Sequence, residues 1–206
     1  MSDSEEKNRG RPRTFERDEL LTKVGDLFWE HGYHNLSFNE IAQAVGLPRA
    51  SLYNAFESKE NLFLEAFKLY KSRSPHRLLR ELKGGDKVSP TLYQLLDEQC
   101  LVLTKFQTRR GCLAMNSVDE LITDETPLGE AIRHICRLES ELVVGLMRQA
   151  KQQNELPQSA DPEATAHMLM TFELGLSAFS KNGMPEQKLR QMCHLFLKNL
   201  GVSITT

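Results

Sequence analysis

The sequence predicts an all-α fold, and three observations carry this prediction. Apolar residues recur at helical spacing through most of the 206-residue chain, as Leu20, Val24 and Phe28 do near its start. Helix-start signals precede such segments: Ser37 and Glu40, three residues apart, form a capping box. No segment shows the strict apolar–polar alternation that is typical of a half-buried strand. We therefore expect about nine helices, arranged as an N-terminal three-helix unit and a larger helical domain.

Local signals bound the N-terminal helices. A first helix is expected over residues 16–31, because Gly32 is a suitable stop. The capping box opens a short second helix, and a third helix of about two turns follows Gly46-Leu47-Pro48. Ser58 is a suitable N-cap for a connecting helix, expected over residues 58–82. The stretch KGGDKVSP, residues 83–90, has the composition of a linker and is the expected domain boundary.

The larger domain, expected over residues 91–206, is predicted to be helical throughout. Asp161-Pro162 is a strong helix start, since an N-cap aspartate precedes proline at the first helical position. The last helix is expected from near Pro185 to just before Gly201. Three further helices are expected over residues 91–107, 113–122 and 127–154.

The composition is typical of a globular cytoplasmic protein. Hydrophobic residues make up 40% of the chain and charged residues 26%, no apolar run is long enough to span a membrane, and the N-terminus lacks the apolar core of a secretory signal. The four cysteines lie far apart without a C-x-x-C pair, so we expect reduced thiols and no metal or other cofactor. The net charge is −2, yet residues 7–80 hold 13 Lys/Arg against 9 Asp/Glu. Local charge of this kind, rather than the total, governs binding to a polyanion.

The stretch VGLPRASLYNAF, which starts at Val45, ends one helix and starts another within a few residues. Two short helices joined by a tight turn that contains glycine form a helix-turn-helix unit, whose second helix enters the major groove of DNA. Gly46 permits the positive φ of such a turn, and Pro48 starts the next helix without losing a hydrogen bond. Leu52 and Phe56 lie four residues apart and are expected to hold the second helix on the core.

The side chains left on the outer face of this second helix suit DNA. Arginine bonds guanine, asparagine bonds adenine, serine and tyrosine hydroxyls reach phosphates, and an alanine methyl touches thymine. A cation at the start of the next helix would bind a phosphate together with free backbone amides. The predicted DNA-binding residues of this unit are Ser37, Arg49, Ala50, Ser51, Tyr53, Asn54 and Lys59. The alternative is an ordinary helical hairpin with a solvated face.

Residues 1–15 are expected to form a flexible basic arm that also binds DNA. Arg9, Arg11 and Arg13 alternate in the stretch RGRPR, which Pro12 keeps extended, and this suits a narrow A·T-rich minor groove. The alternative is a disordered tail that only aids solubility.

Residues 20–67 read LLTKVGDLFWEHGYHNLSFNEIAQAVGLPRASLYNAFESKENLFLEAF. The aromatic-Gly-Tyr end of the first helix, the IA..VG helix, SLYNAF and F.SKE.L together resemble the N-terminal domain of the TetR/AcrR family of transcriptional regulators. The resemblance implies an all-helical homodimer with nine or ten helices in each subunit. It also implies a repressor that binds a palindromic DNA operator and releases it when a small-molecule effector fills a pocket in the larger domain. It also implies that Arg49, Ala50, Tyr53, Asn54 and Lys59 lie at DNA-contact positions.

A second motif, RRGCLAMNSVDEL over residues 109–121, is similar to one in a subset of this family, where Gly-Cys-Leu precedes the sixth helix. Some members of that subset answer electrophiles or oxidants through a cysteine. Cys112 follows two arginines and starts a helix, and both features favour thiolate. The alternative function is therefore a thiol-based redox- or electrophile-responsive repressor. The favoured interpretation of Cys112 is a small apolar residue that closes a helix corner.

The effector pocket is expected among the long helices of the larger domain, which can part around a cavity. Candidates are polar residues in otherwise apolar stretches, and large apolar residues that would suit a hydrophobic effector. The ligand-binding candidates are Tyr93, Gln99, Phe106, Cys112, Met115, Asn116, His134, Met147, His167 and Phe172. Each of them could instead be an ordinary core or surface residue.

The last two helices carry small and apolar residues at helical spacing, which predicts a four-helix dimer interface. Two-fold symmetry would then place the recognition helices about 34–36 Å apart, or a multiple of that, on a palindromic site. Burial within one subunit predicts the same pattern. The residues are Ala164, Met168, Thr171, Gly175 and Ala178, then Leu189, Met192, Phe196 and Leu200.

Other classes of function find less support in the sequence. It contains no G-x-S-x-G, P-loop, H-E-x-x-H or dinucleotide fingerprint, so no enzyme is expected. An architectural or activator DNA-binding protein without an effector would not need a second domain as large as residues 91–206.

Overall fold

The fold is all-α across the part of the chain that the computed structural model describes, residues 14–107 and 109–202. This confirms the predicted fold class. Arg9, Arg11 and Arg13 of the predicted basic arm lie outside the described residues. In chain order the helices are α1 (Thr14–His31), α2 (Phe38–Val45), α3 (Arg49–Phe56), α4 (Lys59–Arg73), α5 (Arg77–Glu81), α6 (Val88–Thr104), α7 (Leu113–Leu121), α8 (Pro127–Gln152), α9 (Pro162–Lys181) and α10 (Glu186–Asn199).

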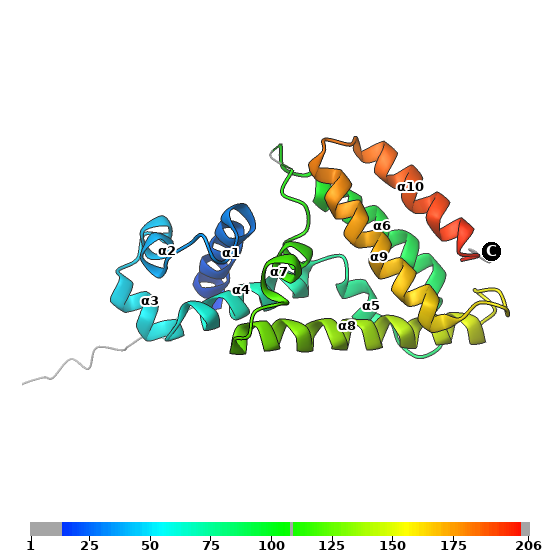
Figure 1. Cartoon of the computed structure of the whole chain (residues 1–206), viewed down its shortest axis with the longest axis horizontal. Helices are drawn as coiled ribbons and strands as arrows, with labels where there is room; N and C mark the ends of the chain where they lie inside the picture. The colour runs from blue at the N-terminus through cyan, green and yellow to red at the C-terminus, as the bar shows by residue number, and fades with distance from the viewer. Residues whose placement is uncertain (1–13, 108, 203–206) are drawn as a thin grey trace, which may run out of the picture.

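The helices lie along the molecule roughly in chain order, except that α7 returns toward α1 and α4 after α6 and the long α8 runs back again (Figure 1). Helices α1, α2 and α3 lie at one end, and α6, α9 and α10 lie together at the other (Figure 1). α4 leads away from the α1–α3 unit, and α8 runs from beside α7 to the far end (Figure 1). The chain thus separates a small N-terminal unit from a larger helical body, and α4 and α7 lie between them.

The predicted helix-start signals are confirmed. The Ser37 hydroxyl accepts a hydrogen bond from the Glu40 amide at 3.2 Å, and the Glu40 carboxylate accepts one from the Ser37 amide at 2.7 Å. Ser58 caps α4 through the Asn61 amide at 3.1 Å. Asp161 caps α9, with Pro162 at its first position. Each cap satisfies a backbone donor that the helix cannot pair by itself.

An aromatic core holds α1 to α4 together. Phe28 of α1 meets Phe63 of α4 edge to face with ring centroids 5.0 Å apart, and Phe67 stacks on Phe63 at 5.6 Å. Leu52 and Phe56 of α3 are buried in the same cluster, as the sequence predicts. Burial of these two large side chains on one short helix fixes its position against α4.

Residues beyond the predicted linker complete this N-terminal core. Leu113 and Leu121 of α7, with Leu128 and Ile132 of α8, are buried in the cluster that contains Phe28 and Phe63. A second cluster joins α5, α6, α9, α10 and the C-terminal half of α8. The two cores therefore do not divide at residues 83–90, although that stretch does connect two helices.

The single connecting helix expected over residues 58–82 is wrong, because the structure contains two helices there. Pro75 lacks an amide hydrogen and would clash with the carbonyl of Lys71, so the helix cannot continue through it. Ser74 precedes this proline and is extended, with φ −70° and ψ 159°. The break adds α5, so the described residues contain ten helices rather than about nine. α6 also begins at Val88, inside the predicted linker.

Candidate nucleic-acid interface and ligand cavity

The turn between α2 and α3 has the geometry that the sequence predicts. Gly46 lies in the left-handed region at φ 71°, and its amide donates to the Gln43 carbonyl at 3.1 Å. The next amide, of Leu47, donates to the Ala42 carbonyl at 3.0 Å, and α3 begins directly after Pro48. The two helices and their turn thus form a compact helix-turn-helix unit.

The outer face of α3 is exposed, and its one ring contact within the described residues is between Tyr53 and Phe38 of α2, with centroids 6.4 Å apart. Arg49, Ala50, Ser51, Tyr53 and Asn54 are all exposed, and 56% of Tyr53 is accessible. Within the described part of the chain, none of these five side chains forms a hydrogen bond or an ion pair. α3 lies at the end of the molecule that is farthest from α9 and α10 (Figure 1). Its polar face can therefore approach a long, flat or grooved partner without steric conflict.

Ser37 and Lys59 lie at helix starts on the same unit. Ser37 is exposed and uses its hydroxyl oxygen as the cap of α2. The Lys59 ammonium lies over the Tyr33 ring, 4.1 Å from its centroid, and partial burial lowers the pKa of this lysine. Lys59 remains at the first position of α4, where backbone amides and a cation together suit an anion.

Helix α7 is tied to the turn that precedes α2. The Glu120 carboxylate accepts hydrogen bonds from the backbone amides of Tyr33, at 2.8 Å, and His34, at 2.7 Å. Gly32, at φ 81°, brings the backbone so close that a Cβ there would lie 3.1 Å from this carboxylate. The His34 ring lies 3.2 Å from the Asp124 carboxylate. α7 therefore fixes the end of α1 and the start of the helix-turn-helix unit.

A cavity of about 280 Å³ lies between α4, α6, α7, α8 and α9. α7 forms one wall with Ala114, Met115 and Val118, and most of the remaining lining is apolar. Gln99 of α6 and Cys112 at the start of α7 also line it. Helix α7 thus contacts both this cavity and the turn before α2.

Charged side chains gather on one side of the cavity. His76 lies between Glu173, whose Oε1 is 2.9 Å from the imidazole Nε2, and Glu139, whose Oε2 is 3.8 Å from Nδ1. Lys71 Nζ lies 2.5 Å from Glu139. Burial alone would lower the pKa of His76, but the two carboxylates outweigh it and raise the pKa to about 10. His76 and Lys71 in turn lower the pKa of Glu139 to about 2, against the effect of its burial.

Comparison with known proteins identifies the family. Residues 26–66 match "Bacterial regulatory proteins, tetR family", and residues 89–196 match "Tetracyclin repressor-like, C-terminal domain". The second match alone covers more than half of the chain. The chain belongs to the TetR family of bacterial regulatory proteins.

TetR-family relatives match along nearly the whole chain. The HTH-type transcriptional repressor ComR of Escherichia coli is 27% identical over 193 residues, which cover 93% of this chain and 92% of ComR. A cysteine mutant of the TetR-family regulator CifR, solved with 26-bp double-stranded operator DNA, is 30% identical with a TM-score of 0.74, and the match covers 93% of this chain and all of that one. The reduced form of E. coli NemR shares the fold, with a TM-score of 0.72 at 18% identity over 92% of this chain and all of NemR. The protein is a DNA-binding transcriptional regulator of the TetR family.

The structure brings only some of the predicted ligand-binding residues to the cavity of this TetR-family protein. Gln99, Cys112 and Met115 line it. Phe106 lines a different hollow, between α1, α4 and α6, where it meets Trp29 edge to face at 5.3 Å. The other six candidates do not line the cavity. Tyr93 donates a hydrogen bond to the Val202 carbonyl, Asn116 donates one to the Arg110 carbonyl, and His167 lies within hydrogen-bond distance of Ser140. His134 is exposed, Met147 is buried in the core, and Phe172 stacks on Phe196.

Sequence reasoning missed the charged side of the cavity. Glu173 was a usable signal, because it is the one charged residue within the apolar run MLMTFELGLSAF and it is 2% exposed. His76 follows the helix break at Pro75, which the sequence analysis also missed. No local pattern could have joined these residues, since nearly a hundred positions separate them in the chain.

The surroundings of Cys112 do not favour the thiol-based alternative. The residue is 6% exposed, and its sulfur lies 3.4 Å from the Tyr70 hydroxyl. Its amide donates to the Ser177 hydroxyl at 3.0 Å. The neighbouring guanidinium of Arg110 pairs with Glu30 at 2.6 Å. Cys112 packs as a buried residue at the start of α7.

Neither a membrane-spanning helix nor a metal-binding cluster occurs in the described residues. Within residues 14–107 and 109–202, no helix combines the length and apolar character needed to cross a bilayer. The same ranges contain no cluster of three or more histidine, cysteine or acidic side chains placed to hold a metal ion.

Proposed function

We propose that this protein is a homodimeric transcriptional repressor that binds a palindromic operator and releases it when a small molecule occupies the cavity. In this proposal residues 16–57 bind DNA, and residues 91–206 bind the second subunit and, together with α4 and His76, the effector. The observation that carries it is the exposed, unpaired polar face of α3 at the end of the molecule. ComR and BdcR of E. coli, two of the relatives, are named repressors. The proposed function has no catalytic step and places the protein in the cytoplasm.

Arg49, Ser51, Tyr53 and Asn54 are the proposed groove and phosphate contacts, with Ala50 against a thymine methyl. All five are exposed on α3. Ser37 and Lys59 would bind phosphates at the starts of α2 and α4. The basic arm, with Arg9, Arg11 and Arg13, would add minor-groove contacts.

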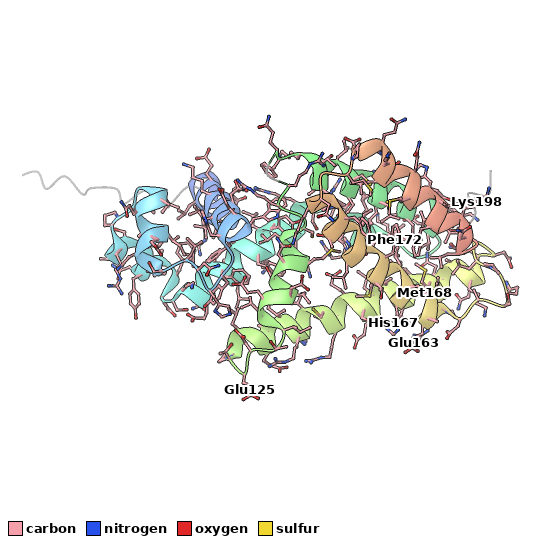
Figure 2. The ribbon with its side chains drawn as sticks, turned by 45° about the horizontal axis from the view of Figure 1, so that its top comes forward. Glu125, Glu163, His167, Met168, Phe172 and Lys198 are labelled. Carbon is pink, nitrogen blue, oxygen red and sulfur yellow. The ribbon has the colours of Figure 1, made fainter. Side chains whose placement is uncertain are left out.

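The proposed dimer interface is the outward face of α9 and α10. Met168 and Phe179 of α9 and Leu195 of α10 are each more than half exposed. Phe172 stacks on Phe196 of α10 at 4.0 Å, and Figure 2 shows Met168 and Phe172 on the same stretch of α9. Exposed apolar side chains on two neighbouring helices favour association with a second copy. Leu189, counted for this face in the sequence analysis, is instead fully buried in its own subunit.

Helix α7 is the proposed route from effector to DNA. Met115 and Val118 face the cavity, whereas Glu120 holds the backbone amides of Tyr33 and His34. A ligand that displaces α7 would therefore shift the end of α1 and, with it, the angle of the helix-turn-helix unit. Because two such units must match two half-sites at once, a small rotation in each subunit weakens binding to the palindrome.

The experiment is an electrophoretic mobility shift with the DNA upstream of the protein's own gene. Arg49→Ala should weaken binding by about tenfold or more, since loss of a bidentate arginine–guanine contact costs about 1–3 kcal/mol. Arg148→Ala is the matched control, because Arg148 is exposed on α8, far from α3. Equal affinities for the two variants would exclude α3 as the recognition helix.

A further inference from the structure

The cavity is mostly apolar, and its charged groups are already paired with one another. Phe67, Met115, Val118, Ile132, Ile135 and Met170 supply much of the apolar wall. A ligand that enters this cavity loses most of its water, so its polar groups must find partners on the wall.

The two carboxylates on the wall have cations against them. Glu173 pairs with His76, and Glu139 lies against Lys71, His76 and Arg80, whose Nη1 is 3.1 Å from it. An anionic ligand would have to compete with these carboxylates for their cations and would meet their negative charge. A cationic ligand would compete with His76 and Lys71 in the same way. Among the residues that line the cavity, the two cations Lys71 and His76 balance the two carboxylates, and Arg80, the third cation at Glu139, is not one of the lining residues.

Two buried polar atoms of the cavity lining make no hydrogen bond within the described residues, Nε2 of Gln99 and Oε2 of Glu139. Oε2 of Glu139 already lies 3.8 Å from Nδ1 of the cationic His76, whereas Gln99, which is 2% exposed, has no such neighbour among the ion pairs of this wall. Gln99 lines the same cavity from α6, and because Nε2 itself has almost no accessible surface, the amide must turn toward the cavity to bind a ligand there. A buried amide N–H without an acceptor is unfavourable, so an acceptor placed at this point would gain a full hydrogen bond.

We propose that the cavity binds a small uncharged molecule whose apolar body carries one hydrogen-bond acceptor, such as a carbonyl oxygen, directed at Nε2 of Gln99. This inference rests on the proposed function only in taking the cavity as the effector site. At about 280 Å³ the cavity lies at the small end of ligand pockets, which favours a compact molecule.

Four aromatic probes of matched size test this class by titration calorimetry: acetophenone, which is neutral with a carbonyl; cumene, which is neutral without an acceptor; benzoate; and 1-phenylethylamine. Acetophenone should bind saturably to the full chain, and each of the two charged probes should bind at least about tenfold more weakly. Benzoate or 1-phenylethylamine binding as tightly as acetophenone, or no probe binding saturably, would overturn the inference. This comparison needs no variant.

A variant then tests the role of Gln99. In Gln99→Leu the affinity for acetophenone should fall by about tenfold, whereas cumene should bind as well or better. Gln94→Leu, on the exposed side of the same helix, should leave both affinities unchanged. Parallel losses for acetophenone and cumene in Gln99→Leu, or no loss for either, would contradict the assigned hydrogen bond. Gln99→Met repeats the test if the leucine variant does not fold.

A mobility shift on the same samples separates this inference from the proposed function. If acetophenone binds but operator DNA is not released, the ligand class holds and the effector-release step of the proposed function fails. If DNA binding is intact but no probe binds, the ligand class fails and the DNA-binding function holds.

Discussion

Glu120 on α7 binds the backbone amide of Tyr33, 87 positions earlier in the chain, at 2.8 Å. The same carboxylate binds the His34 amide at 2.7 Å, so one side chain satisfies two donors at the end of α1. Hydrogen bonds from backbone amides to a carboxylate are stronger than those between neutral groups. This contact makes the position of the helix-turn-helix unit depend on the position of α7.

Glu120→Ala should lower the free energy of unfolding by about 1–3 kcal/mol, because it leaves two backbone donors without their acceptor. It should also reduce the ability of a cavity ligand to release operator DNA. Urea denaturation and a mobility shift with ligand measure the two effects. Asp119→Ala is the control, because Asp119 is the exposed neighbour on the same helix. Matching behaviour of the two variants would show that the Glu120 contact transmits nothing.

Deletion of residues 1–13 should weaken operator binding and flatten its salt dependence. Each arginine that neutralises a phosphate releases counterions, so the slope of log K against log salt should fall by about 1 for each lost contact. A filter-binding series over salt concentration measures this slope. Substitution of Arg9, Arg11 and Arg13 by glutamine in the full chain separates charge from length. An unchanged slope would mean that the arm does not contact DNA.

Stability should fall with rising pH above neutrality because of His76. Its pKa is raised from 6.5 to about 10 in the folded protein, so its contribution is complete below pH 6.5 and is lost as the pH rises toward 10. Between these values the loss is at most about 1.4 kcal/mol per pH unit. Urea unfolding at several pH values should therefore show a shallower decline in His76→Asn than in the unmodified protein. His167→Asn, at an exposed histidine, should retain the original slope.

Glu139, a carboxylate of the same cluster, should affect the free energy of unfolding at low pH. The pKa of Glu139 is lowered from 4.5 to about 2, so its contribution is present above pH 4.5 and is lost as the pH falls toward 2. Glu139→Gln should therefore reduce the sensitivity to acid. If acid sensitivity were the same in this variant, the ion pairs with Lys71 and His76 would not contribute to stability.

Leu195→Asp should shift the protein toward monomer, because it places a charge in the proposed apolar interface. Leu195 is 59% exposed on α10. Light scattering after size exclusion measures the mass, and Leu138→Asp on α8, 52% exposed, is the matched control. If the control dissociates and Leu195→Asp does not, the interface lies on α8 instead.

Most of the N-terminal unit could be predicted because its signals are local. The capping box at Ser37, the left-handed turn at Gly46 and the buried pair on α3 each depend on residues a few positions apart. The wrong prediction over residues 58–82 has a local cause too, because Pro75 alone is enough to end the helix there. Where neighbouring residues decide the structure, the sequence is sufficient.

The cavity could be predicted only in part because it is assembled from distant segments. His76 lies at the start of α5 and Glu173 lies on α9, and no periodic pattern in the sequence connects the two residues. Gln99 was identifiable as a polar residue on the buried side of a helix, whereas Phe172 looked equivalent by spacing and instead faces α10. Helical spacing shows which residues are buried but not which neighbour they meet.

The shared packing of α7 and the start of α8 with the N-terminal helices limits how this regulator can be recombined. A chimera that cuts at residues 83–90 and attaches a foreign sensor domain would lose Leu113, Leu121, Leu128 and Ile132, which complete the core around Phe28. Such hybrids should aggregate or unfold at a lower temperature unless those four residues are taken from the same parent protein as the N-terminal unit. Exchange of operator specificity between paralogues is therefore easier by rewriting the exposed face of α3 than by swapping whole modules.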